Sequence, residues 1–334
     1  MSMTGREIFS RAIHFGGPER VAMTLPEPYP NDKVSIGPAH PPDYQERRWT
    51  EGDNEYWTDE WGCIWGRIAG ISKGEVVQGA ITEWDQLDDY RAPDFGDDRR
   101  YDRAREVVRD NPDKYVIAGL PGGWVFATAR KIRKMDVYLM DLVLEPGRIE
   151  RLHDIIIAEN EKVIRKAAEL GAHGVMVCED WGSQTATLVS PEMFTRIFKP
   201  RIKHVCDLAH SKGMDCLMHS CGCMTALIPD LIEAGVDLFQ FDQPTLHGID
   251  YLNEHFGGRV AFWCPVDIQK TLQTKNPEKI RDEARQMCET LGGHNGGFVA
   301  GYYGDNPALG LDPSVQVIAC EAFVEFGGAA TARP

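Results

Sequence analysis

Apolar and polar positions alternate most regularly after residue 115, where short apolar runs are separated by helical sequence. The run YVIAGL at 115–120 is typical of a buried strand, and SPEMFTRIFKPRIKHVCDLAHSKG predicts a capped helix that ends at Gly213. The other apolar runs after residue 170 are HGVMVCED, MDCLMHS, VDLFQFD, RVAFWC and GGFVAGY. Strands that alternate with helices at this spacing predict right-handed βαβ units and a parallel sheet.

The parallel sheet is predicted to close into a (β/α)8 TIM barrel, an α/β fold. The chain has neither the GxGxxG nor the GxxxxGK[ST] loop that is typical of open nucleotide-binding sheets. Near the start, Thr4 is expected to cap a helix that leads into an apolar strand at 21–25. Residues 26–66 are rich in proline, glycine and tryptophan, which predicts an irregular aromatic-rich excursion within a single domain spanning 1–334.

The C-terminal ends of the strands carry the chemistry of such barrels, so side chains there are candidates for function. His219 and Cys221 end the strand MDCLMHS, and side chains two residues apart on an extended backbone project to the same side. Zinc binds imidazole and thiolate, and a catalytic zinc usually has three protein ligands and one open position. The pair therefore predicts half of a zinc site. The alternative is a buried histidine beside a core cysteine.

A third metal ligand is expected from a neighbouring strand end. Cys264, at the end of RVAFWC, is the predicted third ligand, and a small thiol packed beneath Trp263 is the alternative. Glu179, Asp180 and Asp242 also follow apolar strands. Because buried acids need partners or a function, these three are predicted to be catalytic, or to replace the thiolate on the metal.

A pocket for a flat small ligand is predicted at the same mouth, because aromatic and amide side chains follow several strand ends. The predicted substrate-binding residues are Trp124, Trp181, Gln184, Tyr302 and Tyr303.

Composition and charge limit the classes of partner that the chain is expected to bind. The chain has 51 acidic and 36 basic residues and a net charge of −15, which argues against binding to nucleic acid. No apolar stretch is long enough to span a membrane, and the first 15 residues lack the apolar core of a signal peptide. We expect a cytoplasmic protein whose nine cysteines are mostly reduced thiols, and a homodimer is left open.

A family resemblance rests on the run VCEDWGSQTATLVSPEMFTRIFKPRIKHVCDLAHSKGMDCLMHSCG, on LIPDLIEAGVDLFQFDQP and on GRVAFWCPVDIQKTL. Over residues 115–326 the chain resembles the uroporphyrinogen decarboxylase superfamily, and more narrowly its branch of corrinoid-dependent methyltransferases. The resemblance implies a (β/α)8 barrel. In that branch an HxC motif and a distant cysteine bind zinc, and His219 and Cys221 match the HxC. Where the family has its third cysteine this chain has GYYGDNP, so Cys264, Glu179 or Asp242 would have to substitute.

The decarboxylases themselves are a poorer match. They follow their first strand with an arginine-bearing RQAGRY segment that holds the substrate's carboxylates, whereas this chain has LPEPYPNDK there. Their tyrosine after a PxTL turn is also absent, since PGGWVFATA occupies that region. An octa-anionic substrate would meet a protein of charge −15 without those arginines.

The resemblance implies a zinc-dependent enzyme that moves a methyl group between a small methylated donor, such as a methoxylated aromatic, and a corrinoid (cobalamin). Because the chain lacks a DxHxxG corrinoid-binding motif, the corrinoid is expected on a separate partner protein. Three alternatives remain open: methyl transfer from methylcorrinoid to a thiol or tetrahydrofolate, a decarboxylase of the uroporphyrinogen decarboxylase type, and a non-catalytic corrinoid- or tetrapyrrole-binding protein.

Overall fold

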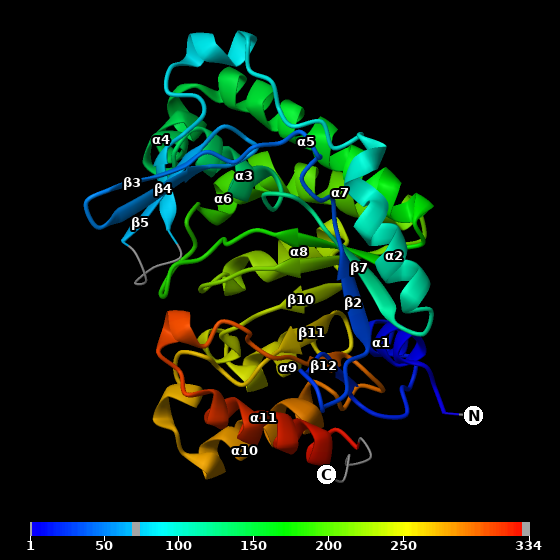
Figure 1. Ribbon diagram of the computed structural model, residues 1–334. Helices are drawn as coiled ribbons and strands as arrows, with labels where there is room; N and C mark the ends of the chain where they lie inside the picture. Colours follow the sequence, from blue (N-terminus) through cyan, green and yellow to red (C-terminus); the bar gives the residue numbers. More distant parts are fainter. Residues whose placement is uncertain (1, 69–73, 329–334) are drawn as a thin grey trace.

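Eight parallel strands form a curled sheet at the centre of the computed structural model, which describes residues 2–68 and 74–328 (Figure 1). The strands are β1 (Ala22–Met23), β2 (Lys33–Ile36), β7 (Tyr115–Gly119), β8 (Gly174–Cys178), β9 (Asp215–His219), β10 (Leu238–Gln240), β11 (Ala261–Cys264) and β12 (Phe298–Ala300). Their order is β1-β12-β11-β10-β9-β8-β7-β2. The turn between β1 and β2 joins the two edges, with Thr24 bridging Asn31 and the Asp32 N–H donating to the Met23 carbonyl at 2.7 Å. The predicted (β/α)8 TIM-barrel class is confirmed.

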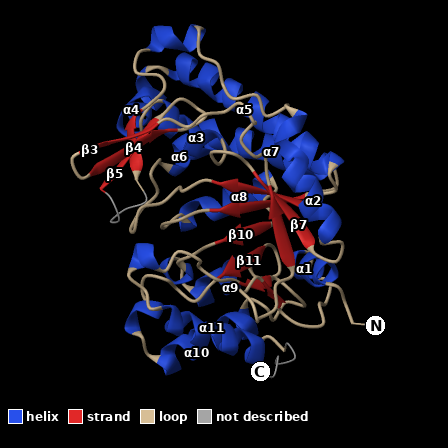
Figure 2. Cartoon of the chain, viewed as in Figure 1, coloured by secondary structure: helices blue, strands red, loops and turns tan. Residues whose placement is uncertain are grey.

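Helices surround the sheet (Figure 2). They are α1 (Gly5–Ile13), α2 (Asp102–Asp110), α3 (Val125–Ile132), α4 (Met135–Leu144), α5 (Pro146–Glu169), α6 (Pro191–Met193), α7 (Lys199–Ser211), α8 (Ile228–Ala234), α9 (Ile249–Phe256), α10 (Pro277–Thr290) and α11 (Pro313–Phe326). The predicted caps are present: the Thr4 hydroxyl accepts from the Glu7 N–H in a capping box, and Gly213 follows α7 with a φ of +72°. Among the described residues, none of these helices has the length and apolarity needed to cross a bilayer.

Side chains on each barrel strand alternate between two cores, because successive residues of a strand point to opposite faces. One core lies inside the barrel, and the larger one lies between the strands and the helices. The inner core contains Ala22, Tyr115, Ile117, Leu217, Leu238, Ala261 and Val299 and is closed at one end by Ile8, Phe9, Ala12 and Ile13 of α1. His219 follows Leu217 by two residues and therefore faces the interior at the other, open end.

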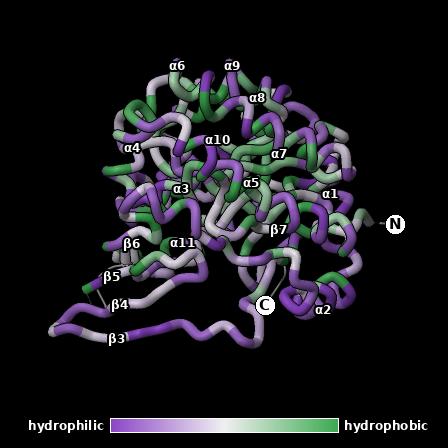
Figure 3. Tube along the Cα trace, turned by 90° about the horizontal axis from the view of Figure 1, so that it is seen from above, coloured by the Kyte–Doolittle hydropathy of each residue, from purple (hydrophilic) through white to green (hydrophobic). Residues whose placement is uncertain are grey.

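The segment predicted as an irregular excursion over 26–66 is more ordered than expected, and its limits differ. It contains β2, a strand of the barrel itself, and then an antiparallel sheet that extends to residue 78. That sheet is made of β3 (Arg48–Glu51), β4 (Asn54–Thr58), β5 (Ile64–Ile68) and β6 (Glu75–Gln78). Figure 3 shows β3 at the edge of the molecule as a hydrophilic strand. Aromatic cross-strand pairs account for the order, since the Trp57 and Trp65 rings stack with centroids 6.0 Å apart.

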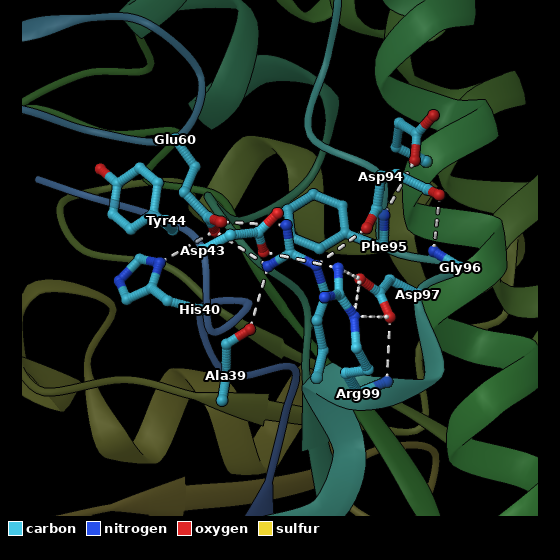
Figure 4. Close-up of polar contacts among 12 residues, drawn as sticks. Ala39, His40, Asp43, Tyr44, Glu60, Asp94, Phe95, Gly96, Asp97 and Arg99 are labelled. Atoms are coloured by element: carbon cyan, nitrogen blue, oxygen red, sulfur yellow. Dashed lines mark hydrogen bonds and ion pairs between the residues drawn. The ribbon is translucent and has the colours of Figure 1, made fainter.

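A buried arginine fixes this segment to the barrel. The Arg100 side chain is 3% exposed, and its guanidinium pairs with Glu60 at 2.9 Å and donates to the Ala39 and Asp94 carbonyls at 2.9 and 2.8 Å. His40 contacts the other Glu60 oxygen at 3.1 Å (Figure 4). Because these bonds cross from the excursion to the segment before α2, the excursion is attached at its base. The single-domain organisation stays a prediction, which limited proteolysis can test by searching for a stable fragment.

Candidate metal centre

Three potential metal ligands converge at the open end of the barrel. The ligand atoms of Asp180, His219 and Cys221 all lie within 4.8 Å of one another. His219 Nε2 is 3.4 Å from Asp180 Oδ1 and 3.4 Å from Cys221 Sγ. All three side chains are partly accessible, as a site that meets a substrate must be. Within the described ranges, this is the group of acids, histidines and cysteines whose geometry fits one ion.

Two neighbouring loops bring these ligands together. Asp180 follows β8, whereas His219 ends β9 and Cys221 follows it, and the register pairs Cys178 with His219. The backbone bonds continue past the strand ends, with the Glu179 N–H donating to the His219 carbonyl at 2.9 Å. The Cys221 N–H then donates to Asp180 Oδ1 at 3.0 Å. The parallel pairing of two adjacent strands therefore positions both halves of the site.

Electrostatics make the metal-free triad an ion pair. Burial alone would lower the pKa of His219, but its bonds to Asp180 and Cys221 raise that pKa well above the usual range. For Asp180, burial works in the opposite direction, and the bonds from His219 and from the Cys221 N–H hold its pKa well below the usual range. A metal ion would have to displace the proton that His219 Nε2 carries, so metal binding there releases protons.

A second layer of side chains orients the ligands. His219 Nδ1 donates to Gln240 Oε1, and Gln240 Nε2 donates to Asp242 Oδ1 at 2.8 Å. The chain of bonds leaves Nε2 as the histidine atom available to an ion. On the other side, Arg130 Nη2 lies 3.3 Å from Asp180 Oδ2, and Arg130 Nη1 donates to the Asp180 carbonyl at 3.2 Å. Asp180 therefore keeps Oδ1 for the triad and Oδ2 for the arginine.

Cys264 requires a correction, because it does not face the mouth. The thiol is fully buried in the cluster between the strands and the helices, together with Phe241 and Phe262. Trp263, its neighbour on β11, packs against the inner core instead. Since strand side chains alternate, an inward Trp263 turns Cys264 outward. Burial raises the pKa of the Cys264 thiol far above its usual range, which disfavours the thiolate that zinc requires.

Glu179 also points away from the mouth. It follows Val175 and Val177 on the outer side of β8 and is fully buried. Its Oε2 accepts from the Ala127 N–H of α3 at 3.1 Å, whereas Oε1 has no hydrogen-bond partner among the described residues. Burial raises the pKa of Glu179 to about 8, so this side chain is mostly protonated at neutral pH. Of the two adjacent acids, the structure brings Asp180 to the triad and places Glu179 behind it.

The residues predicted to line the substrate pocket differ in where their side chains lie. Trp124 and Trp181 are at most 1% exposed, and Trp181 stacks on Phe126 with ring centroids 4.5 Å apart, so these tryptophans fill the core beneath the helices instead of lining the mouth. Gln184 is exposed after β8 and accepts from Gln243 Nε2 at 3.4 Å.

Tyr302 and Tyr303 follow β12 and are half-buried. The Tyr302 hydroxyl accepts from Asn306 Nδ2 at 3.3 Å, and the Tyr303 carbonyl accepts from Gln316 Nε2 at 2.6 Å. Their contact with a substrate stays a prediction.

Sequence reasoning missed the residues that support the triad. Gln240 and Arg130 carry no motif, and only their bonds to His219 and Asp180 reveal them. Cys178 was also overlooked, although it pairs in register with His219 and shares the inward side of β8 with Met176. An alternation count along VMVCED, started from a known inward residue, would have found Cys178.

A close backbone approach is expected to make Gly222 indispensable. A Cβ at Gly222 would lie 2.0 Å from the Gly182 carbonyl oxygen, and φ there is +78°. Gly222→Ala should therefore destabilise the protein by at least about 3 kcal/mol and impair metal binding, because the β8 and β9 loops must separate. Gly213→Ala is the matched control, since φ is +72° but nothing lies within 4 Å; it should cost about 1 kcal/mol. Equal losses in denaturant unfolding would contradict this interpretation.

Gln240 is expected to tune metal affinity without contacting the ion. Gln240→Leu removes the acceptor for His219 Nδ1, so the zinc dissociation constant should rise about 10- to 100-fold. Gln184→Leu, at an exposed position outside the triad, should leave it unchanged. Competition with a fluorescent zinc chelator measures the zinc dissociation constant of both variants. An unchanged dissociation constant in Gln240→Leu would show that His219 is held by other contacts.

Comparisons with known proteins agree with the fold and the family resemblance. The sequence model of the family described as Uroporphyrinogen decarboxylase (URO-D) matches residues 71–328. A curated relative, a methylated-thiol–coenzyme M methyltransferase of Methanosarcina mazei, is 22% identical over 142 residues, which is 41% of this chain and 36% of the relative. A solved structure of a methyltransferase from Methanosarcina mazei superposes with a TM-score of 0.62 at 18% identity, over 80% of this chain and 76% of that one. The structural likeness is one of fold.

Proposed function

This chain belongs to the uroporphyrinogen decarboxylase (URO-D) family, and from this premise we propose that it is a methyltransferase. The proposed metal centre is the triad Asp180, His219 and Cys221. The methyl group passes between a small methylated donor, for which we favour a methoxylated aromatic, and a corrinoid on a separate protein. The observation that carries the proposal is the convergence of three zinc-type ligands at the open end of a family barrel. The named relative supports methyl transfer as the chemistry.

The donor set fits zinc. A carboxylate oxygen, an imidazole nitrogen and a thiolate sulfur are its usual ligands, and three of them leave a fourth position for a substrate atom. Two anionic ligands balance the charge of a divalent ion. When bound there, zinc would supply a Lewis acid that polarises the oxygen or sulfur from which the methyl group leaves. The carboxylate of Asp180 would take the third place, for which Cys264 is the residue predicted from sequence.

The chain's own residues would prepare this step. Gln240 holds His219 with Nε2 toward the ion site, and Arg130 holds Asp180 with Oδ1 toward it. Asp242, which accepts from Gln240, is the proposed acid on the inner side of the barrel. Glu179 is buried next to Asp180 and would keep its proton there. It would therefore add no negative charge to the metal centre.

A donor screen tests the proposal. The zinc-loaded protein is mixed with a reduced corrinoid protein and with a panel of methoxybenzoates, aliphatic methyl ethers and methylated thiols. Methyl-cobalt absorbance together with a demethylated product is expected for at least one methoxylated aromatic. Absence of both readouts for every donor, with zinc bound at one equivalent, would overturn the proposed chemistry while leaving the metal site in place.

A methylated thiol is the second candidate substrate, and the name of the curated relative favours it. Because the matched segment spans only 36% of that relative, its substrate is carried over as a proposal. The same screen separates the two, since turnover confined to the methylated thiols would select this candidate and reject the aromatic ethers.

A further inference from the structure

A cavity outside the triad lies between the small antiparallel sheet and the α3–α4 corner. It has a volume of about 520 Å³, within the range of small-molecule sites. Its walls come from β5, β6, α3 and α4, and Figure 1 shows these elements grouped on one side of the barrel. The lining residues are Trp65, Glu75, Val76, Arg130, Lys131, Lys134, Met135, Asp136 and Leu139.

One wall of this cavity is flat and held in place. Trp65 donates from Nε1 to Asp59 Oδ2 at 2.7 Å, and its ring stacks on Trp57 at an interplanar angle of 13°. Lys131 Nζ lies 5.9 Å from the same ring. Val76 and Leu139 are half-buried and apolar, so together with the indole they offer a preformed surface for a flat apolar body.

The polar part of the lining selects the charge of a ligand. Among the described residues, three cations line the cavity in a protein of charge −15, and Lys134 forms a loose pair with Asp136 at 3.8 Å. Lys131 is already engaged, since its Nζ donates to the Gly122 carbonyl at 2.9 Å. Glu75 and Asp136 leave one net positive charge in the described part of the lining, so a monoanion is favoured over a dianion.

Arg130 connects this cavity to the metal centre. Arg130 lines the cavity, and its guanidinium also holds Asp180 Oδ2 at 3.3 Å. A carboxylate in the cavity would compete with Asp180 for the guanidinium and so release Asp180 from the bonds that orient it.

We propose that the cavity between β5–β6 and α3–α4 binds a small aromatic monocarboxylate, with its ring on Trp65 and its carboxylate at Lys134 and Arg130. Occupancy of the cavity weakens zinc binding at the triad, because Arg130 no longer holds Asp180 with Oδ1 toward the ion. The binding itself is independent of methyl transfer. The coupling rests on the proposed zinc site.

Calorimetric titration of the metal-free protein tests the binding. Sodium benzoate is expected to bind with a Kd of about 1 mM, and neutral benzamide at least about tenfold more weakly. Lys134→Glu should weaken benzoate about tenfold, whereas Lys212→Glu, an equal charge change at an exposed position after α7, should stay within about twofold. No benzoate binding, or equal effects of the two substitutions, would overturn the site. Benzamide binding as tightly as benzoate would overturn the anion selectivity.

Zinc titrations with and without saturating benzoate test the coupling. Benzoate should weaken zinc binding about fivefold, and by linkage zinc should weaken benzoate binding by the same factor. In Arg130→Gln, the fold-change in zinc affinity caused by benzoate and the fold-change in benzoate affinity caused by zinc should both fall to one. If the unmodified protein had the same zinc affinity with and without benzoate, the proposed link through Arg130 would be overturned. Absence of zinc binding altogether would reject the metal site instead, and the benzoate titration on metal-free protein would still decide whether the cavity binds.

Discussion

Cys221→Ser is expected to empty the metal centre and to lower methyl transfer on the order of a thousandfold. The thiolate is one of three ligands, its Sγ lies 3.4 Å from His219 Nε2, and a serine hydroxyl is a poor zinc ligand at neutral pH. The protein itself should stay folded, because Cys221 is only partly buried. Elemental analysis after dialysis measures the zinc, and the corrinoid assay measures the transfer.

Cys264→Ser supplies the matched control, since the same atom is exchanged at the other candidate thiol. Cys264 is buried among Phe241 and Phe262, so a hydroxyl there should lower the thermal midpoint but leave zinc at one equivalent. Full zinc retention in Cys221→Ser would refute the assignment of the triad. Loss of zinc from both Cys221→Ser and Cys264→Ser would instead restore the ligand set expected from sequence, which contains both thiols.

Glu179→Gln is expected to stabilise the metal-free protein by about 4 kcal/mol at pH 8 and by less than about 1 kcal/mol at pH 4.5. Burial raises the pKa of Glu179 from 4.5 to about 8, so between these values the folded state keeps a proton that the unfolded state has released. Stability conferred by this residue therefore falls as the pH rises from 4.5 to 8 and is constant above that range. The glutamine removes the ionisation and keeps an acceptor for the Ala127 N–H.

Urea unfolding across pH 4.5–9 in the presence of a chelator measures this difference. Glu254→Gln, at an exposed position on α9, is the control and should follow the unmodified protein at every pH. If Glu179→Gln and the unmodified protein kept a constant difference across the range, Glu179 would be ionised in the folded state, and the account of its burial would be wrong.

The barrel could be predicted from sequence because each strand after residue 115 is a continuous apolar run between helical segments. The second strand, KVSI in β2, escaped because it is short and half-buried and lies in a region dominated by proline and glycine. Pairing with β7 along its whole length, which is a tertiary effect, makes it a strand.

The candidate site was predicted in part for a related reason. His219 and Cys221 belong to one short motif, so their common side follows from backbone geometry. Sequence cannot decide whether Glu179 or Asp180 reaches the metal centre, or whether the Cys264 side chain points into the barrel. Both answers depend on which face of the strand is the inner one. Strands that are apolar on both faces, such as AFWC in β11, carry no alternation that would reveal it.

All three proposed ligands fall within 42 consecutive positions, 180 to 221, which run from the loop after β8 through α6, α7 and β9 to the loop after β9. During synthesis the whole ligand set is therefore made before β10, β11 and β12. If the proposed site binds zinc, an ion could join β8 to β9 before the last strands pair, and metal supply would then affect the folding yield in addition to the activity of the finished protein.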